Sequence, residues 1–288
     1  MIHRQPSSRI RRGFADIAEG QVHFRTAGEG RGGVPLVMLH ASPGSAKMLE
    51  PLILGLSRNR HVIATDTLGN GDSCAPQAGE KPPIAYFADA HLRALDALGI
   101  DAFDLYGTHT GANIACEIAI AHPARVRRLI LDGVSLYAPE EQADMLANYA
   151  PGVTLDLNGS QLHWIWHFVR DVYLFWPWYR RDAAHRRNLG LPSADELHDK
   201  VVEVLKAART YHIPYNAAFA YDKAARLPLV RTPTLTSCAE SDMFAEYFDR
   251  VRELIPGSQS LLTSGTGSAE GLSTTVQLFE AFLNCSST

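Results

Sequence analysis

Short β-rich runs alternate with helical patterns along the first 135 residues, and this alternation limits the possible fold more than any other feature. The runs that indicate strands occupy residues 22–28, 35–40, 61–66, 103–107 and 126–133. Between them, apolar side chains recur at helical spacing around residues 45–57, 84–99 and 112–119. Strands that alternate with helices through compact connections predict an α/β fold with a mostly parallel sheet, covered by helices on both faces.

The alternation stops near residue 137 and resumes near residue 227. The intervening residues are helical in tendency and rich in aromatic side chains, and they contain all four tryptophans. A strand over 232–240, a helix over 244–254, a strand near 258–263 and a closing helix near 271–283 follow. An insertion between two parts of one sheet predicts a core of residues 1–136 and 227–288 with a helical lid, residues 137–226.

Composition describes an ordinary globular chain. Of its 288 residues 46% are hydrophobic, and the net charge of −4 gives no electrostatic reason to expect nucleic acid or an anionic membrane as partner. No stretch reaches the roughly 18 apolar residues of a membrane span. The basic N-terminus, with Arg9, Arg11 and Arg12, is interpreted as a solvated leader.

The four cysteines, Cys74, Cys116, Cys238 and Cys285, are far apart in the sequence and form no C-x-x-C pair. We therefore expect reduced thiols and a cytoplasmic protein. Residues 28–33 formally match G-x-G-x-x-G, but they lead into a strand instead of opening a helix. This placement predicts a hairpin-type turn and not a dinucleotide site.

The segment Gly107-Thr108-His109-Thr110-Gly111 has the glycine spacing of G-x-S-x-G, with histidine at the centre. It lies between the strand FDLY and an alanine-lined helix. In a tight strand-to-helix turn of this kind, flanking glycines avoid clashes and the central side chain is pushed into a pocket. His109 is therefore the leading candidate for a catalytic residue.

Five motifs occur in the same order as in a known family: LHASPGS, DTLGNGDS, the elbow (the turn GTHTG around His109), HPARVRRLIL and TPTLTSCAESD. Over roughly residues 20–288 the chain resembles the α/β-hydrolase superfamily, especially its esterase, dehalogenase and epoxide-hydrolase-like members. The resemblance implies the α/β-hydrolase fold, with backbone N–H groups of Ser42 and Thr110 as oxyanion donors. His40 is usually structural in the LHASPGS motif, and a contact with substrate is the alternative.

The resemblance also implies an acid, for which Asp242 is favoured and Asp132 is the alternative. The family's general base, a histidine after the last strand, is missing, because Ser268 occupies the expected place and no histidine follows His212. Both the elbow serine and the triad histidine have therefore changed, which excludes ordinary Ser-His-Asp catalysis.

Three interpretations of this double change remain open. His109 acts as nucleophile or base in the hydrolysis of an ester or carbonyl compound, with Ser268 orienting its ring or binding substrate. Alternatively, His109 is the base of a cofactor-free lyase or proton-transfer enzyme. The third interpretation is an inactive, ligand-binding homologue. A helix N-terminus disfavours imidazolium, so we expect His109 to be neutral near pH 7.

The inserted segment provides candidates for the walls of a pocket. Trp164, Trp166 and His167 lie in its aromatic run and are predicted to contact substrate, which indicates an apolar or aromatic small molecule. His163 and His167 stand four residues apart, but without further ligands they do not indicate zinc. The sequence implies neither a metal nor a cofactor, and a monomer and a homodimer are both compatible with it.

Overall fold

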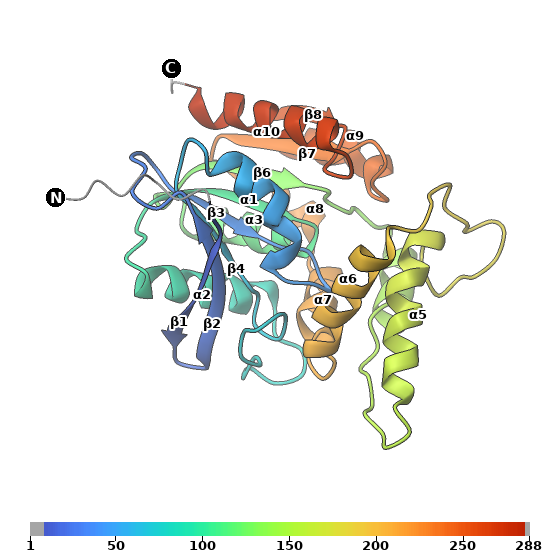
Figure 1. Cartoon of the computed structure of the whole chain (residues 1–288). Coiled ribbons are helices and arrows are strands. Elements are labelled where there is room, and N and C mark those ends of the chain that lie inside the picture. The colour runs from blue at the N-terminus through green and yellow to red at the C-terminus, as the bar shows by residue number, and fades with distance from the viewer. Residues whose placement is uncertain (1–8, 286–288) are drawn as a thin grey trace.

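One eight-stranded sheet runs through this computed structural model, which describes residues 9–285 (Figure 1). The strands lie in the order β1-β2-β4-β3-β5-β6-β7-β8. Their bounds are β1 Arg11–Ile17, β2 Gly20–Ala27, β3 Leu36–Leu39, β4 Val62–Thr65, β5 Phe103–Thr108, β6 Val126–Asp132, β7 Thr234–Ala239 and β8 Gln259–Thr263. The strands from β4 to β8 pair in parallel, whereas β1 and β2 pair antiparallel at one edge. The predicted mostly parallel sheet is confirmed.

Helices α1 and α10 cover one face of this sheet, and α2 and α3 cover the other. The bounds in the first half of the chain are η1 Ala46–Leu49, α1 Glu50–Leu56, α2 Ile84–Ala97 and α3 Thr110–Ala121. Those near the end are η3 Ala245–Tyr247, α9 Phe248–Glu253 and α10 Ala269–Asn284. Each predicted strand and helix of the core therefore has a counterpart, with bounds shifted by a few residues.

Two features near the N-terminus differ from the sequence-based expectation. Arg11 and Arg12 belong to the edge strand β1 and not to a solvated leader, because residues 11–17 pair along their whole length with β2. The glycine-rich segment 28–33 is not a hairpin turn: β4 lies between β2 and β3, so the segment is a crossover connection. Alternation in β1 is weak, since only Ala15 is buried, which explains why the strand was missed.

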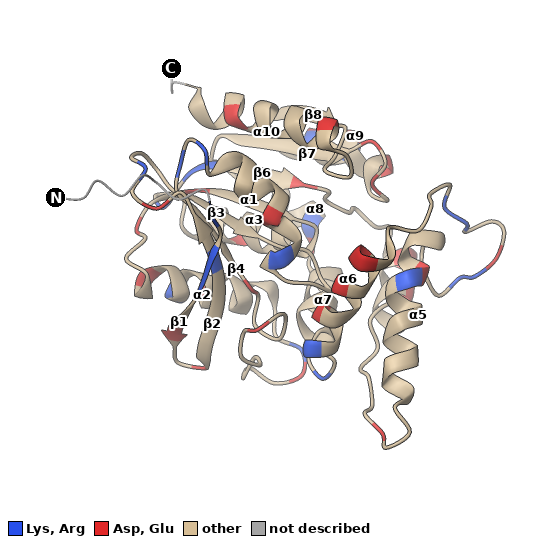
Figure 2. Ribbon diagram, in the orientation of Figure 1, with Lys and Arg blue, Asp and Glu red and all other residues tan. Residues whose placement is uncertain are grey.

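Acidic and basic residues are interspersed over the elements (Figure 2). Asp104 on β5 is fully buried and accepts hydrogen bonds from Arg60, ahead of β4, and from Arg127 on β6. Arg60 also donates to the side chain of Asn284 at the end of α10, at 2.7 Å. This buried network joins the last helix to the centre of the sheet.

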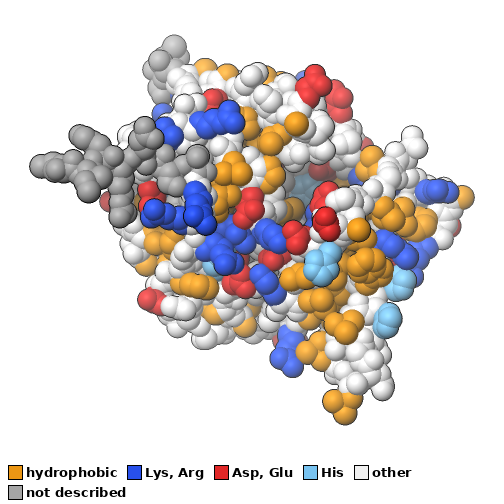
Figure 3. Space-filling view, viewed as in Figure 1, with side chains coloured by type: hydrophobic (Ala, Val, Ile, Leu, Met, Phe, Trp, Pro, Cys, Tyr) orange, Lys and Arg blue, Asp and Glu red, His pale blue; other side chains and the backbone are white. Residues whose placement is uncertain are grey.

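The segment between β6 and β7 contains α4 Pro139–Asn148, α5 Ser160–Leu174, α6 Ala194–Lys206, α7 His212–Ala220, α8 Lys223–Arg226 and η2 Leu227–Leu229. It has its own apolar cluster, with Tyr149, Phe168 and Tyr211 fully buried. Helix α5 projects away from the sheet (Figure 1), and hydrophobic side chains gather over this part of the face shown in Figure 3. The helices of this segment follow β6 and precede β7; that the segment acts as a lid remains a prediction. None of the described helices is long and apolar enough to cross a membrane.

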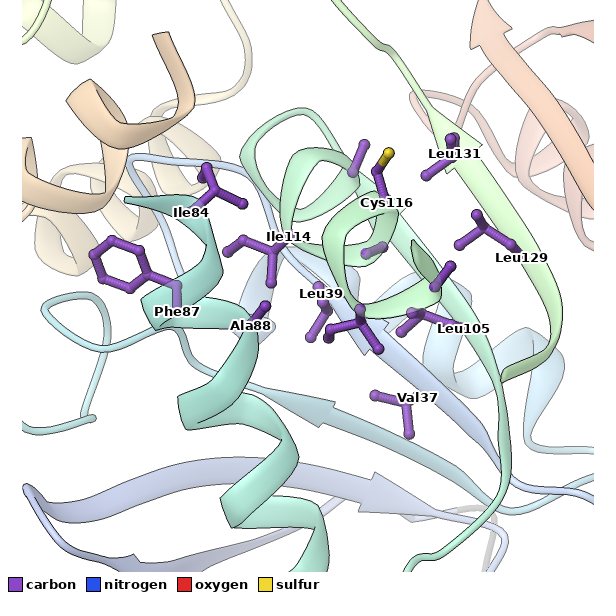
Figure 4. Close-up of a cluster of buried hydrophobic side chains, with 14 of the residues drawn as sticks. Val37, Leu39, Ile84, Phe87, Ala88, Leu105, Ile114, Cys116, Leu129 and Leu131 are labelled. Atoms are coloured by element: carbon purple, nitrogen blue, oxygen red, sulfur yellow. The ribbon is translucent and has the colours of Figure 1, made fainter. Parts of the chain in front are cut away.

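Alternate residues of the central strands supply the two faces of the core. On β3, Val37 and Leu39 face α2 and α3, whereas Leu36 and Met38 pack on the side of α1 and α10. Figure 4 shows Val37, Leu39, Leu105, Leu129 and Leu131 from three strands in one cluster with side chains of α2 and α3. Burial on both faces fixes the carboxyl ends of β5, β6 and β7 beside one another, and these ends carry the candidate site.

Candidate active site

The turn from β5 into α3, called the elbow below, has a strained backbone. His109 links the two elements with φ 51° and ψ −110°, and it has the only positive φ among the non-glycine residues that the structure describes. Its backbone N–H donates to the carbonyl of Asp132 on the neighbouring strand, at 3.0 Å. A bulky residue with positive φ is uncommon and persists where the surrounding structure holds it.

The flanking glycines are required by the close approach of main chains. A Cβ at Gly107 would lie 2.2 Å from the carbonyl oxygen of Gly111, and a Cβ at Gly111 would lie 2.2 Å from that of Leu39. Neither contact is possible for a real side chain. The G-x-H-x-G spacing is therefore a requirement of this turn and not a coincidence of composition.

His109 is hydrogen-bonded to Asp242 in the loop after β7. The distance from Nε2 of His109 to Oδ2 of Asp242 is 2.8 Å. The other carboxylate oxygen of Asp242 accepts the backbone N–H of Phe244, also at 2.8 Å, and the Phe244 ring packs against the imidazole. The side chain of His109 keeps 22% of its surface accessible. Its Nδ1 has no hydrogen-bond partner within residues 9–285 and is not enclosed.

This ion pair sets the pKa values of both groups. Burial by itself lowers the pKa of His109, but the charge of Asp242 and its hydrogen bond outweigh burial, so the pKa lies above the ordinary 6.5. The shift is thus opposite in direction to the one expected from the helix N-terminus. Burial raises the pKa of Asp242, but His109 more than offsets this, and the pKa lies below the ordinary 3.8.

Asp132, the alternative acid, is committed to other partners. Its carboxylate accepts hydrogen bonds from Tyr106 at 2.7 Å and from Ser237 at 2.6 Å. Burial, the largest effect, raises the pKa of Asp132. Its hydrogen bond with His109 is made by the backbone carbonyl, which accepts the N–H of His109. The geometry therefore favours Asp242 over Asp132 as the partner of the imidazole.

Ser268 does not contact His109. It is the N-cap of α10, and its hydroxyl accepts the backbone N–H of Gly271 at 3.0 Å. It lines a cavity of about 410 Å³ together with Asp242 and Arg187. A role for Ser268 in orienting the ring is not supported by this geometry, because no hydrogen bond joins it to His109 among the described residues.

The proposed oxyanion donors and His40 lie where β3 and β5 end. The backbone N–H groups of Ser42 and Thr110 have no acceptor among the described residues, and both residues are buried. His40 is fully buried, with Nδ1 at 2.7 Å from the carbonyl of Ala41 and Nε2 accepting the N–H of Thr67 at 2.9 Å. Both ring nitrogens of His40 are occupied, so it serves the loop and is not placed to bind substrate.

Comparison with known proteins agrees with the fold described above. A family model described as alpha/beta hydrolase fold matches residues 34–156. The solved structure of the enol-lactonase from Burkholderia xenovorans superposes with a TM-score of 0.72 at 19% identity, over 94% of this chain and 99% of the enol-lactonase. The chain has the α/β-hydrolase fold. The resemblance seen in the sequence is thereby confirmed at the level of the fold.

Curated relatives of this α/β-hydrolase-fold chain match over shorter stretches. Proline iminopeptidase of Heyndrickxia coagulans is 29% identical over 136 residues, 47% of this chain and 47% of the relative. 2-Hydroxymuconate semialdehyde hydrolase of Pseudomonas putida is 41% identical over 104 residues, 35% of this chain and 36% of the relative. The chain is thus related to hydrolases, but the matches span less than half the length of either.

The predicted pocket residues of the inserted segment lie elsewhere in this α/β-hydrolase fold. Trp166 and His167 are exposed on the outer side of α5. Trp164 packs inside the segment against Phe168, Trp178 and Tyr211. The prediction that these three contact substrate is therefore not supported. Helical spacing shows which residues share a face but not which face points to the core.

Other aromatic side chains lie beside His109. Phe244 contacts His109, with ring centroids 4.7 Å apart, and Trp176 and Tyr137 pack edge-on against Phe244. Trp176 comes from the inserted segment, so this cluster joins the segment to the core. The run FWPW carried no sign that Trp176 would reach the site, because it follows the end of α5.

Arg187 is a charged residue of the site that the sequence did not reveal. It lines the cavity with Asp242, and two of its nitrogens donate to backbone carbonyls, those of Val172 at 2.8 Å and Ser241 at 3.4 Å. Three other arginines of the inserted segment have acidic partners: Arg170 and Arg181 pair with Asp171, and Arg180 pairs with Asp144. Arg187 thus brings a positive charge beside the His109–Asp242 pair.

Within the described residues one group of side chains has the spacing of a metal site: His23, Asp66 and Asp72. The Asp66 carboxylate already accepts hydrogen bonds from the N–H groups of Ala46 and Asp72 and contacts His23 at 2.8 Å. Lys206 pairs with Asp72. These partners satisfy the carboxylates, and we assign no ion to the group.

Proposed function

We propose that this protein is a hydrolase in which the His109–Asp242 pair activates water towards a small ester or carbonyl compound. One observation carries the proposal: Asp242 binds Nε2 of His109, and within the described part of the chain the other ring nitrogen, Nδ1, has no partner. With the carboxylate accepting from Nε2–H, the lone pair of Nδ1 is available as a base. A base held by a carboxylate is the arrangement that general-base catalysis requires.

The same geometry favours a base over a nucleophile. Nδ1 is the ring nitrogen nearer to the main chain, since it is bonded to the carbon that carries Cβ. The strained elbow and the contact with Phe244 restrict the ring further. A carbonyl carbon would have to approach closely to be attacked by Nδ1, whereas a water molecule bridges that gap.

In the proposed step, Nδ1 accepts a proton from water while the water oxygen bonds to the carbonyl carbon. The carbonyl oxygen becomes an oxyanion, and the N–H groups of Ser42 and Thr110 are its proposed donors. When the carbonyl reforms, the bond to the leaving oxygen breaks, and the proton on Nδ1 passes to that oxygen. The products are a carboxylic acid and an alcohol, and His109 returns to its starting state.

The surroundings favour a substrate with an apolar part and a negative group. Phe244, Trp176 and Tyr137 supply an aromatic wall, and Arg187 supplies the cation. Relatives named as a semialdehyde hydrolase and an enol-lactonase fit a small carbonyl-containing substrate. No nucleic acid, membrane, metal or cofactor is part of this proposal.

A second candidate function is cofactor-free proton transfer or carbon–carbon cleavage. The raised pKa of His109 favours it, because a more basic imidazole is better suited to remove a proton from a carbon acid or a hydroxyl group. This chemistry needs the same base and oxyanion donors but no attacking water.

A panel of chromogenic esters of varied chain length tests the hydrolase proposal. Wild type, His109→Ala and the double variant His109→Ser with Ser268→His are compared. We expect turnover by wild type and a loss of about 100-fold or more in His109→Ala. Turnover that is absent in wild type and appears only in the double variant would contradict the proposal.

Product analysis then separates the remaining possibilities. Hydrolysis in ¹⁸O-labelled water incorporates one labelled oxygen into the acid product. Conversion of a bound carbonyl compound without incorporated oxygen supports the proton-transfer candidate. Tight binding of the compound with no conversion identifies a binding protein.

A further inference from the structure

Gly133, the residue directly after β6, lies against the imidazole of His109. A Cβ built on Gly133 would be 2.6 Å from Cδ2 and 2.7 Å from Nε2 of His109, and 3.5 Å from Oδ2 of Asp242. Real Cβ atoms are essentially never found within 3.0 Å of such a neighbour. Any side chain at this position would therefore enter the space beside the hydrogen bond between the two groups.

The main chain at Gly133 has little freedom to retreat. Its N–H donates to the carbonyl of Ser237 on β7 at 2.9 Å, and the residue is buried. Its φ is +63°, the left-handed region that favours glycine. With the backbone held on one side, the imidazole is the group that a Cβ would displace.

Phe244 also contacts the ring of His109. The Phe244 ring packs at 4.7 Å between centroids, and its backbone N–H holds the Asp242 carboxylate. The imidazole thus lies in a slot with Phe244 and Asp242 as two of its sides and the bare Cα of Gly133 as another. An imidazole needs more room than the serine side chain usual in such an elbow, and the missing Cβ at residue 133 provides it.

We propose that Gly133 is a positioning residue, whose lack of a side chain lets His109 stand at the elbow and reach Asp242. The proposal rests on the His109–Asp242 pair of the proposed function but not on turnover.

Gly133→Ala tests this proposal, with Gly99→Ala as the matched control. Gly99 also has a positive φ, +70°, but no atom lies within 4 Å of its added Cβ. The control therefore carries the backbone strain without the clash. A titration of the His109 ring protons by NMR reports the pairing directly, whether or not an ester is turned over.

We expect Gly133→Ala to lower the pKa of His109 towards or below 6.5, since the carboxylate no longer supports the charged ring, and Gly99→Ala to leave it unchanged. Ester turnover, where wild type shows it, falls about tenfold or more, and its acidic limb moves to lower pH. A folded Gly133→Ala protein with the wild-type His109 titration overturns the proposal. If the three proteins show these His109 titrations but wild type turns over no ester, the proposed function is refuted. The positioning role of Gly133 is then still supported.

A double-mutant cycle covers the case in which Gly133→Ala is poorly folded. If the added methyl clashes with the imidazole, combining Gly133→Ala with His109→Ala removes the clash. Adding Gly133→Ala to the His109→Ala protein should then lower the midpoint of thermal unfolding only slightly. The decrease should be no larger than the one that Gly99→Ala causes in wild type. If Gly133→Ala lowers the midpoint of thermal unfolding equally with and without the His109 side chain, glycine is needed at residue 133 for its backbone conformation alone, and the proposal is overturned.

Discussion

At the scale of single residues, the protonation of His109 decides whether the site works as a base. The ring must be neutral to accept a proton, and its pKa is raised above 6.5 by Asp242. Activity should therefore be full above this pKa and decline as pH falls through it. We expect the midpoint of the acidic limb of kcat/KM to lie above about pH 6.5.

Asp242→Asn should shift the pH dependence in the direction opposite to that caused by the Asp242 carboxylate in wild type. Without the carboxylate charge, burial remains and lowers the pKa of His109, so the acidic limb should move below about pH 6.5. Turnover at neutral pH should fall about 100-fold, because a neutral amide cannot hold the ring as an anionic acceptor does. An unchanged pH profile in this variant would show that the titration belongs to another group.

The charge of Arg187 should make the site prefer substrates that carry a negative group. Arg187 is the cation beside Asp242 in the cavity, and a charged hydrogen bond contributes about 1.5–3 kcal/mol. Arg187→Met, which keeps the aliphatic stem, should raise KM about 10- to 100-fold for an ester that carries a carboxylate. A neutral ester of the same size should be affected less than about threefold. Arg186→Met, a change at an exposed neighbouring residue, is the control. Equal effects of Arg187→Met on the KM of the charged and the neutral ester would contradict a role of Arg187 in binding the carboxylate.

At the scale of the elements, the contact between α3 and β3 holds the elbow. A Cβ on Gly111 meets the carbonyl of Leu39 at 2.2 Å, so the helix and the strand would have to separate. In an unobstructed helix, alanine is favoured over glycine by about 1 kcal/mol. Here we expect the opposite sign: Gly111→Ala should lower the free energy of unfolding by about 2 kcal/mol or more.

Denaturant unfolding measures this change, and the elbow gives an independent signal. The His109 ring should lose its raised pKa in the same variant, because its backbone starts α3. Gly190→Ala, where no atom lies within 4 Å of the added Cβ, should change stability by less than about 0.5 kcal/mol. A neutral or stabilising effect of Gly111→Ala would mean that the two elements separate at little cost.

At the scale of the whole molecule, the sequence predicted most of the fold and only part of the site. The strands of the core were recognisable because burial on both faces makes them continuous apolar runs, as in β3 and β4. The elbow was recognisable because two close backbone approaches demand Gly107 and Gly111. Both signals are local in sequence.

The missed residues depend on contacts between distant segments. Arg187 lies on an irregular stretch of the inserted segment and lines a cavity with Asp242, which is far from it along the chain. Gly133 lies against His109 across a strand pairing. Trp166 and His167 were misplaced because an aromatic run on a helix does not show which side faces inward. Cytoplasmic location and a monomeric or dimeric state remain predictions.

The buried network around Asp104 makes a last prediction at the molecular scale. Asp104 on β5 is fully buried and faces two arginines, Arg60 and Arg127, and Arg60 continues to Asn284 on α10. Removing one member of a buried ion pair leaves charge without compensation and typically costs about 3–5 kcal/mol. Asp104→Asn should therefore lower the free energy of unfolding by about 3 kcal/mol.

The control for this network is an exposed ion pair on the same chain. Asp249 pairs with Arg252 at 3.2 Å, and both side chains are largely exposed, so Asp249→Asn should cost less than about 1 kcal/mol. Urea unfolding at low and high salt separates the two cases. Salt screens exposed charges, so raising it should diminish the small effect at Asp249 and leave most of the effect at Asp104. Similar losses in the free energy of unfolding for Asp104→Asn and Asp249→Asn would show that the Asp104 network does not join α10 to the sheet.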